Sequence, residues 1–410
     1  MTPVTGTAPR FKAYHHDRRM KPIYLDHHAT TPVDPAVLEA MLPYFGQKYG
    51  NPSSRSHAFG QEAHGAVERA REQVAALIGA SPEEIVFTSG ATESNNLAVR
   101  GAARPLAAKG RHVVTTTIEH AAVLEPCRSL EREGFEVTRV GVGPSGVVAA
   151  SDVAGALRPD TVLVSVMAAN NEVGTIQPVA EVGALCRERG IVFHSDAVQA
   201  VGRLPASVED WGVDLLSLSA HKMYGPKGTG ALYVRKGRRP RLRLQPQNEG
   251  GGQEHGLRSG TLNVPGIVGF GEAARLAAES FATGEPERVR GLRDRLWAGL
   301  RERIGEVELN GAAEPRLPGN LHVSIARTEA EVLILSLGGG IAISSGAACA
   351  EAGGKGSHVL RALGLPDERV YTALRFGVGR YNSAPEIDAV VGALAAAVSG
   401  ARARSSAVPR

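Results

Sequence analysis

Hydrophobic and polar positions follow two alternating periods along most of this chain. Residues 58–78 place Val67 and Ile78 on one helical face and reach Gly79, which predicts a helix that ends there. Residues 84–88 form a short apolar run that predicts a strand. The alternation continues, with strands predicted over 112–115, 135–140, 161–166 and 191–194 and helices over 121–133 and 179–189. This pattern predicts a doubly wound α/β domain, with a mostly parallel sheet covered on both faces.

The pattern changes after the glycine-rich run at residues 250–256. Two long helical stretches are predicted next, and the strands that follow them are shorter, which indicates a smaller α+β domain. A cleft between two such domains is a common place for an active site. We therefore expect four parts: a basic lead over 1–22, a large domain over 23–280 whose first residues pack on the small domain, a small domain over 281–398 and a tail over 399–410.

Composition and charge narrow the class of protein. The chain has 410 residues, of which 43% are hydrophobic and 21% charged, as in ordinary globular proteins. Part of the net charge of +4 comes from two local clusters, over 10–21 and 235–241. These clusters do not form a continuous basic face, so direct nucleic-acid binding is not expected. Because no apolar run approaches the roughly 20 residues of a membrane helix and the start lacks a secretory pattern, we expect a cytoplasmic protein that does not contact a membrane.

The cysteine content also favours a cytoplasmic protein. The chain has 3 cysteines, Cys127, Cys186 and Cys349. They are too few for a disulfide framework in a chain of this size, and no two of them have the spacing of metal ligands. We therefore expect a reducing compartment and no metal site.

Lys222 stands at the end of an apolar run, residues 215–219, just before the glycine and proline at positions 225 and 226. In open α/β sheets, ligands bind outside the carboxyl ends of the strands. Lys222 is therefore a candidate ligand-binding residue. The alternative is an ordinary solvated lysine in a turn.

Two further strand ends carry polar clusters. Residues 88–96 follow a strand and open a helix, so a phosphate could bind there, although Thr92 could instead simply cap the helix. Asp196 could pair with a protonated ring nitrogen and Gln199 could bond a ring oxygen, although Asp196 could also be a helix cap. With the imine-forming amine of Lys222, these residues fit pyridoxal phosphate.

Three other side chains are candidates for chemistry. His120 ends another predicted strand and could stack on a cofactor ring and exchange protons, or be a structural histidine. Cys349 lies among small residues before a glycine-rich stretch, as expected of an exposed nucleophile or an incidental surface thiol, whereas Cys127 and Cys186 fall in helical patterns and are expected to be buried. Arg375 could clamp a substrate carboxylate or form a structural salt bridge.

Taken together, six segments resemble the cysteine desulfurases, which are fold-type-I pyridoxal-phosphate enzymes of the class V aminotransferase group. The resemblance runs from about residue 23 to about residue 398. It implies a homodimer in which the large domain binds the cofactor and the small C-terminal domain carries a mobile cysteine loop. The segments occur in order at residues 24–32, 50–54, 88–96, 219–222, 258–261 and 344–349.

The resemblance also implies roles for individual residues. Lys222 would attach pyridoxal phosphate, Asp196 would pair with its ring nitrogen and His120 would stack on its ring. The remaining cofactor contacts would come from Ala91, Thr92, Asn171, Gln199, Ser219 and His221, with Thr261 reaching the phosphate bound by the partner subunit. The carboxylate of the substrate would be held by Asn51 and Arg375.

The implied reaction removes sulfur from L-cysteine, releases L-alanine and leaves a persulfide on Cys349. The loop around Cys349 resembles that of the housekeeping and nitrogen-fixation type. A scaffold or sulfur-carrier protein would accept the sulfur, for iron–sulfur cluster assembly, tRNA thiolation or DNA sulfur modification. The alternatives are a selenocysteine lyase or an aminotransferase of the same fold, or a non-catalytic platform for sulfur transfer.

Overall fold

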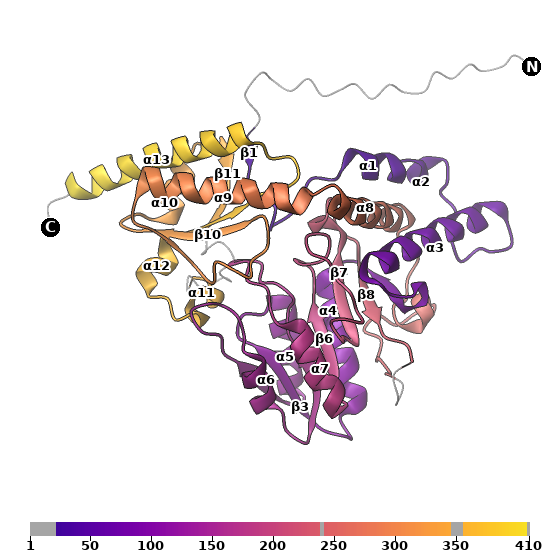
Figure 1. The fold of residues 1–410 in the computed structure, drawn as a ribbon. Coiled ribbons are helices and arrows are strands. Elements are labelled where there is room, and N and C mark those ends of the chain that lie inside the picture. Colours follow the sequence, from indigo (N-terminus) through magenta and orange to yellow (C-terminus); the bar gives the residue numbers. More distant parts are fainter. Residues whose placement is uncertain (1–21, 238–241, 346–355, 408–410) are drawn as a thin grey trace, which may run out of the picture.

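The computed structural model describes residues 22–237, 242–345 and 356–407, which form a large domain and a smaller one (Figure 1). Seven strands make the sheet of the large domain, in the order β2-β8-β7-β6-β5-β3-β4. The strands from β7 to β4 in this order are parallel, and β8 is antiparallel to both β7 and β2. The predicted mostly parallel α/β sheet is thus confirmed. The strands are β2 (Ile85–Thr88), β3 (His112–Thr116), β4 (Glu136–Val140), β5 (Thr161–Ser165), β6 (Val192–Asp196), β7 (Leu215–Ser219) and β8 (Gly230–Val234).

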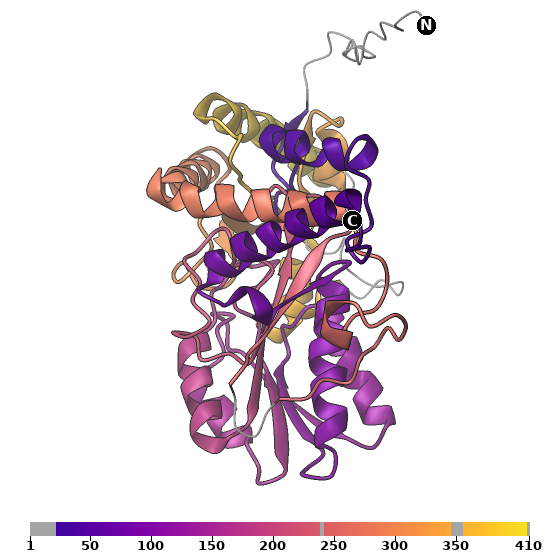
Figure 2. The ribbon, with the colours of Figure 1, turned by 90° about the vertical axis from the view of Figure 1, so that its right-hand side faces the viewer.

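Helices cover both faces of this sheet, and Figure 2 shows the sheet between them. Successive strand residues point to opposite faces, so Leu215 packs in one apolar cluster and Leu216 in another. The cluster of Leu215 includes side chains of α4 (Ala91–Ala103) and α5 (Ala121–Arg132). The opposite cluster is covered chiefly by three helices, and α6 (Ala150–Ala156) adds Val153 to it. The three are α3 (Ala58–Ile78), α7 (Val179–Arg189) and α8 (Val264–Ala282).

The small domain is built on a four-stranded antiparallel sheet in the order β12-β13-β10-β9. These strands are β9 (Val307–Leu309), β10 (Asn320–Ile325), β12 (Ser344–Ser345) and β13 (Ala373–Gly377). Together they give the smaller α+β domain that the sequence predicts. The helices of this domain are α9 (Glu285–Ile304), α10 (Ala330–Ser336), α11 (His358–Ala362), α12 (Asp367–Tyr371) and α13 (Ala384–Ala407).

The first described segment ties the two domains together. Strand β1 (Ile23–Tyr24) pairs in parallel with β11 (Ile341–Ala342) of the small domain. The next residue, Leu25, is buried in the core of the small domain. The chain then crosses to the large domain, where α1 (Pro35–Met41) and α2 (Pro43–Gly46) contact α8. Residues 26–34 therefore span the junction, beside the turn that holds Lys222.

The end of the chain differs from the expected tail over 399–410, because α13 continues to Ala407. Val398 and Ala401 are buried in the core of the small domain. The guanidinium of Arg402 donates to the carbonyl oxygens of Ala326 at 2.9 Å and Ile304 at 3.1 Å. The alanine-rich run around 389–397 indicates a helix in the sequence, but residues 399–407 give no apolar period, which hides the continuation of this helix.

Helix α13 also contains the one described segment, Ala384–Arg404, that is long and apolar enough by length and composition to cross a membrane. Its side chains Ile387, Val390 and Leu394 are buried against the small domain. Packing within the protein therefore accounts for the apolar face of this helix.

Candidate active site

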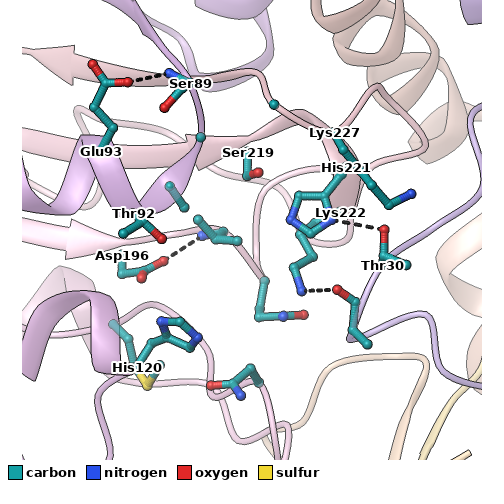
Figure 3. Close-up of a pocket in the computed structure, with 18 of the residues that line it drawn as sticks. Thr30, Ser89, Thr92, Glu93, His120, Asp196, Ser219, His221, Lys222 and Lys227 are labelled. Atoms are coloured by element: carbon teal, nitrogen blue, oxygen red, sulfur yellow. Dashed lines mark hydrogen bonds between the residues drawn. The ribbon is translucent and has the colours of Figure 1, made fainter. Parts of the chain in front are cut away.

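A cavity of about 560 Å³ opens at the carboxyl ends of the parallel strands (Figure 3). Residues after β3, β5, β6 and β7 line it together with the first turn of α4. This is where open α/β sheets bind ligands, because the loops that leave neighbouring parallel strands meet at one edge. Nine of the residues predicted from the sequence line this cavity: Ala91, Thr92, His120, Asn171, Asp196, Gln199, Ser219, His221 and Lys222.

The first turn of α4 forms one end of the cavity. Gly90 precedes the helix with a φ of 147°, and no side chain caps the helix start. The hydrogen bonds of the helix begin with the N–H of Ser94, which donates to the carbonyl of Gly90 at 3.1 Å. The N–H groups of Ala91 and Thr92 lie before this first bond of the helix. They are therefore available to bind an anion.

A carboxylate stands near this anion site, but other groups neutralise it. Oε2 of Glu93 accepts the N–H of Ser89 at 2.7 Å, and Figure 3 shows this contact. Oε1 of Glu93 accepts Nε of Arg258 at 2.9 Å. Although burial raises the pKa of Glu93, the hydrogen bonds from Arg258 and Ser89 bring that pKa below its usual value. Glu93 is thus an ion-pair partner of Arg258, which limits its repulsion of a phosphate at the helix start.

Asp196 ends β6 and is buried at the cavity wall. Its Oδ2 accepts Nδ2 of Asn95 at 2.7 Å, and its Oδ1 accepts the N–H of Val198 at 3.1 Å. These two donors fix the orientation of the carboxylate, which can pair with a protonated ring nitrogen. Sequence reasoning missed Asn95, although it lies three residues after Thr92 and hence on the same side of α4.

Lys222 closes the short turn η3 (Ala220–Lys222) after β7. Its Nζ donates to the carbonyl oxygens of His28 at 2.5 Å and Ala29 at 2.7 Å. Burial lowers the pKa of Lys222 to about 7, and the positive charges of Arg203 and Arg375 add to this effect. A substantial fraction of this amine is therefore neutral near pH 7, as attack on an aldehyde requires.

The two histidines of the cavity are held by different contacts. His120 caps α5, where its Nδ1 accepts the N–H of Ala122 at 3.1 Å, so the neutral ring carries its proton on Nε2. Burial lowers the pKa of His120. Nδ1 of His221 lies 3.1 Å from Oγ1 of Thr30, and burial lowers the pKa of His221 to about 4. Both imidazoles are therefore favoured in their neutral forms at pH 7.

Gln199 faces the cavity from the turn that follows β6. Its Oε1 accepts Nη1 of Arg203 at 2.6 Å, and its Nε2 donates to the carbonyl of His28 at 3.0 Å. An amide nitrogen has two hydrogens. One hydrogen of Nε2 can therefore still reach a ligand in the cavity.

Arg375 lies in β13 and contacts the backbone of the cavity-lining residue Asn171. Its guanidinium donates to the carbonyl of Asn171 at 3.0 Å, to Oδ1 of Asp26 at 2.9 Å and to Oγ of Ser344 at 3.2 Å. Its buried Nε has no hydrogen-bond partner within the described part of the chain. Because a buried donor without a partner is unfavourable, Arg375 retains capacity for an anionic ligand.

Besides Arg375, two predicted site residues in the described part of the chain, Thr261 and Asn51, do not line this cavity. Thr261 is exposed on the segment that precedes α8. Asn51 is also exposed, and its Oδ1 accepts the N–H of Ser53 at 2.9 Å. Cys349 lies outside the described residues. The other two cysteines, Cys127 and Cys186, are buried, which confirms the expectation of buried thiols.

The residues of the cavity fit pyridoxal phosphate. Its aldehyde needs an amine that can be neutral, which Lys222 offers. Its ring nitrogen needs a fixed carboxylate, which Asp196 offers. Its phosphate needs donors, and the unused N–H groups at the start of α4 and the hydroxyls of Thr92 and Ser219 line the same space. The three requirements are met within one cavity.

Known proteins resemble this chain along nearly its whole length. The family described as Aminotransferase class-V matches residues 23–390. "Cysteine desulfurase IscS" from Anaeromyxobacter dehalogenans (strain 2CP-C) is 56% identical over 367 residues, which is 90% of either chain. A solved structure of a "NIFS-LIKE PROTEIN" has a TM-score of 0.86 and 40% identity, and covers 92% of this chain and 100% of its own. One described as "SspA in complex with cysteine" has a TM-score of 0.75 and 37% identity, and covers 88% and 100%.

These matches agree with the fold and with the cavity. They confirm the resemblance seen in the sequence, and with it the predicted cofactor, pyridoxal phosphate, and the predicted class of enzyme. The chain belongs to the class-V aminotransferase family of pyridoxal-phosphate enzymes and, within it, to the cysteine desulfurases.

Proposed function

We propose that this cysteine desulfurase binds pyridoxal phosphate on Lys222, holds the carboxylate of L-cysteine with Arg375 and passes the sulfur to Cys349. The observation that carries the proposal is the meeting of Lys222, Asp196 and the uncapped start of α4 in one cavity of about 560 Å³. The similar structure described as "SspA in complex with cysteine" supports the same substrate.

The proposed cofactor contacts follow from the donors and acceptors of the cavity. The N–H groups of Ala91 and Thr92, with the side chains of Thr92, Ser219 and His221, would hold the phosphate. Asp196 would keep the ring nitrogen protonated, and Asn95 would keep Asp196 in place. When bound, pyridoxal phosphate supplies an electron sink for the carbon atoms of the substrate.

Other contacts would orient the ring. Nε2 of Gln199 is proposed to donate to the ring oxygen with the hydrogen that His28 does not use. Asn171 lines the same cavity and is proposed to lie beside the ring. The imidazole of His120 is proposed to stack on the ring, next to the carboxylate of Asp196 (Figure 3).

Proton movement is assigned to two atoms. The Nζ of Lys222 has a lowered pKa, so it can both release and accept a proton near pH 7. The Nδ1 of His120 is occupied by the N–H of Ala122, which leaves Nε2 for proton exchange with the substrate. These assignments give the cavity two proton-exchanging groups.

Substrate binding is assigned to Arg375, with Asn51 as a second contact to the carboxylate. The guanidinium of Arg375 already pairs with Asp26, and its unused Nε is available to the substrate. Thr261 is exposed, and in the proposed homodimer it would reach the phosphate bound by the partner subunit. The site would then be completed only in the dimer.

In the proposed sulfur transfer, the thiolate of Cys349 attacks the sulfur atom of L-cysteine. A sulfur–sulfur bond forms and the carbon–sulfur bond of the substrate breaks. The electron pair of the broken bond stays on the substrate carbon, which takes up a proton and leaves as part of L-alanine. The persulfide on Cys349 would then pass to a scaffold or carrier protein in the cytoplasm. Iron–sulfur assembly, tRNA thiolation and DNA sulfur modification are the proposed destinations.

The test replaces one cysteine at a time. Cys349→Ala should keep the visible absorption of the bound cofactor but lose persulfide formation and the release of L-alanine from L-cysteine. Cys127→Ala is the matched control, because burial raises the pKa of the Cys127 thiol to about 12 and so makes it a poor nucleophile. Alanine release at the parent rate by Cys349→Ala would show that the proposed nucleophile is wrong.

A further inference from the structure

Tyr224, two residues after Lys222, has a backbone conformation that is unusual for its type. Its φ is 64°, in the left-handed region that favours glycine. Its side chain is buried, with 9% of its surface exposed. A bulky residue keeps such a conformation only where its surroundings enforce it, and these positions cluster at functional sites.

The backbone of Tyr224 is held by the segment that joins the two domains. Its N–H donates to Oγ1 of Thr31 at 2.9 Å, and its carbonyl accepts the N–H of Asp34 at 2.9 Å. Thr31 also donates to the carbonyl of His221, from its N–H at 3.0 Å and from its Oγ1 at 2.9 Å. Thr31 therefore forms hydrogen bonds with His221, the residue before Lys222, and with Tyr224, two residues after it.

The ring of Tyr224 is held by the small domain. Its hydroxyl oxygen accepts the N–H of Arg380 at 2.5 Å. The guanidinium carbon of Arg380 lies 4.4 Å from the centre of the ring. Arg380 is itself fixed by Asp34 at 2.9 Å and by Glu285 at 2.7 Å. The small domain thus contacts the Lys222 turn, residues 220–224, through the phenol group of Tyr224.

The glycine before Arg380 shows how close this contact is. A Cβ added to Gly379 would lie 2.5 Å from the ring of His27 and 2.6 Å from the hydroxyl oxygen of Tyr224. Both separations are shorter than van der Waals contact, so a methyl group at position 379 would push the phenol and the ring of His27 aside. The fit between residues 379–380 and Tyr224 is therefore tight enough to transmit a displacement.

We propose that Tyr224 is a positioning residue, which couples the docking of small-domain residues 379–380 to the position of Lys222 Nζ. The coupling runs from the phenol to the strained backbone of Tyr224 and from there to Lys222. Loss of the hydroxyl would let the turn relax and move Nζ away from the carbonyl oxygens of His28 and Ala29. This inference rests on the proposed role of Lys222 as the lysine that binds the cofactor.

The test compares Tyr224→Phe with Tyr381→Phe. The phenol of Tyr381 is the control for the contacts around Asp34, because its ring packs on Tyr224 at 5.6 Å and its hydroxyl donates at 2.7 Å to Oδ2 of Asp34, which also accepts Arg380, but not to the Lys222 turn. Tyr224→Phe should lower kcat for L-cysteine about tenfold with little change in KM, because small misplacements of reacting groups slow the chemical step. Tyr381→Phe should remain near the parent values.

A second readout does not depend on turnover. The apoenzyme is treated with an amine-acylating reagent over a range of pH, and the modification of Lys222 is followed by mass spectrometry of its peptide. In Tyr224→Phe the midpoint of this modification should rise toward that of a free lysine, because Nζ moves to a more hydrated place. A structural role alone would lower the melting temperature without moving this midpoint.

Three further variants keep the outcomes distinct. If Tyr224→Phe does not fold, Gly379→Ala displaces the phenol together with the ring of His27 and should raise the same midpoint, whereas His27→Ala alone should leave that midpoint near the parent value. Parent values of kcat and of the midpoint in Tyr224→Phe, or equal changes in Tyr381→Phe, would overturn the inference. Lys222→Ala that still shows the visible absorption of bound cofactor would instead overturn the proposed role of Lys222.

Discussion

Replacing Glu254 by glutamine should destabilise the large domain, because Glu254 is the buried anchor of the segment that carries Thr261. Its carboxylate accepts both terminal nitrogens of Arg71 at 2.8 Å and the N–H of Phe87 at 2.7 Å. The side chains of Arg71 and Glu254 are 6% and 1% exposed, so water cannot replace the lost contacts. The φ of Glu254 is 49°, which adds strain that the ion pair must offset.

The size of the effect follows from these contacts. Glutamine keeps one acceptor oxygen but turns a donor toward the guanidinium of Arg71. Removing one partner of a buried ion pair costs about 3–5 kcal/mol. The lower end is expected here, because Glu68 still lies 3.3 Å from Nε of Arg71. A loss of about 3 kcal/mol corresponds to a fall in melting temperature of about 6–12 °C, if each kcal/mol lowers it by about 2–4 °C in a large domain.

The assay is thermal unfolding of Glu254→Gln, Arg71→Met and the double variant at one scan rate. The double variant should lose less stability than the sum of the single changes, because the two groups stabilise each other. Glu254→Gln should also weaken cofactor binding in the proposed dimer, since it loosens the segment around Thr261. A Glu254→Gln protein within about 1 kcal/mol of the parent, with additive single changes, would refute the reasoning.

Three further predictions concern the cavity. The rate constant for capture of pyridoxal phosphate by the apoenzyme should rise with pH through about 7 and then level off, because burial lowers the pKa of Lys222 to about 7 and only its neutral amine reacts; stopped-flow rates that keep rising to about pH 10, the value for a free lysine, would contradict this. Thr92→Val should raise the dissociation constant of the cofactor about tenfold or more in equilibrium dialysis, because a hydrogen bond to a charged group contributes about 1.5–3 kcal/mol; an unchanged constant would exclude a contact with the phosphate. Arg375→Lys should raise KM for L-cysteine about tenfold, since lysine lacks the fork that binds a carboxylate, while an unchanged KM would assign Arg375 to the Asp26 ion pair alone.

Local patterns predicted the parts of the fold that depend on local contacts. The helix over 58–78 ends at Gly79, whose φ of 67° suits glycine, so its end could be predicted from one residue. The cavity residues Asp196 and Lys222 could be found because polar residues directly after apolar strands stand out. The family resemblance added Asn171 to the predicted site residues. Neither the hydrophobic period nor the spacing of polar residues indicated a role for it.

Other features depend on residues that are distant in the sequence, so no local pattern reports them. The pairing of β1 with β11 joins Ile23 to Ile341. The antiparallel direction of β8 arises because residues 220–229 return the chain directly beside β7, which the periodicity of the strand does not record. The contact between Asn95 and Asp196 joins a helix interior to a strand end, and only the folded chain brings them to 2.7 Å.

The return of the first strand to the small domain has a consequence for how the protein can be made and divided. Asp26 and Arg375 form an ion pair across 349 positions of the chain. During synthesis the small domain therefore cannot be completed until nearly all residues have left the ribosome, whereas the sheet of the large domain ends at Val234. A fragment that starts at Glu285 would lack β1 and the buried Leu25. The small domain is therefore not a portable unit, and its Arg375 would have no Asp26 beside it unless the N-terminal segment were supplied in trans.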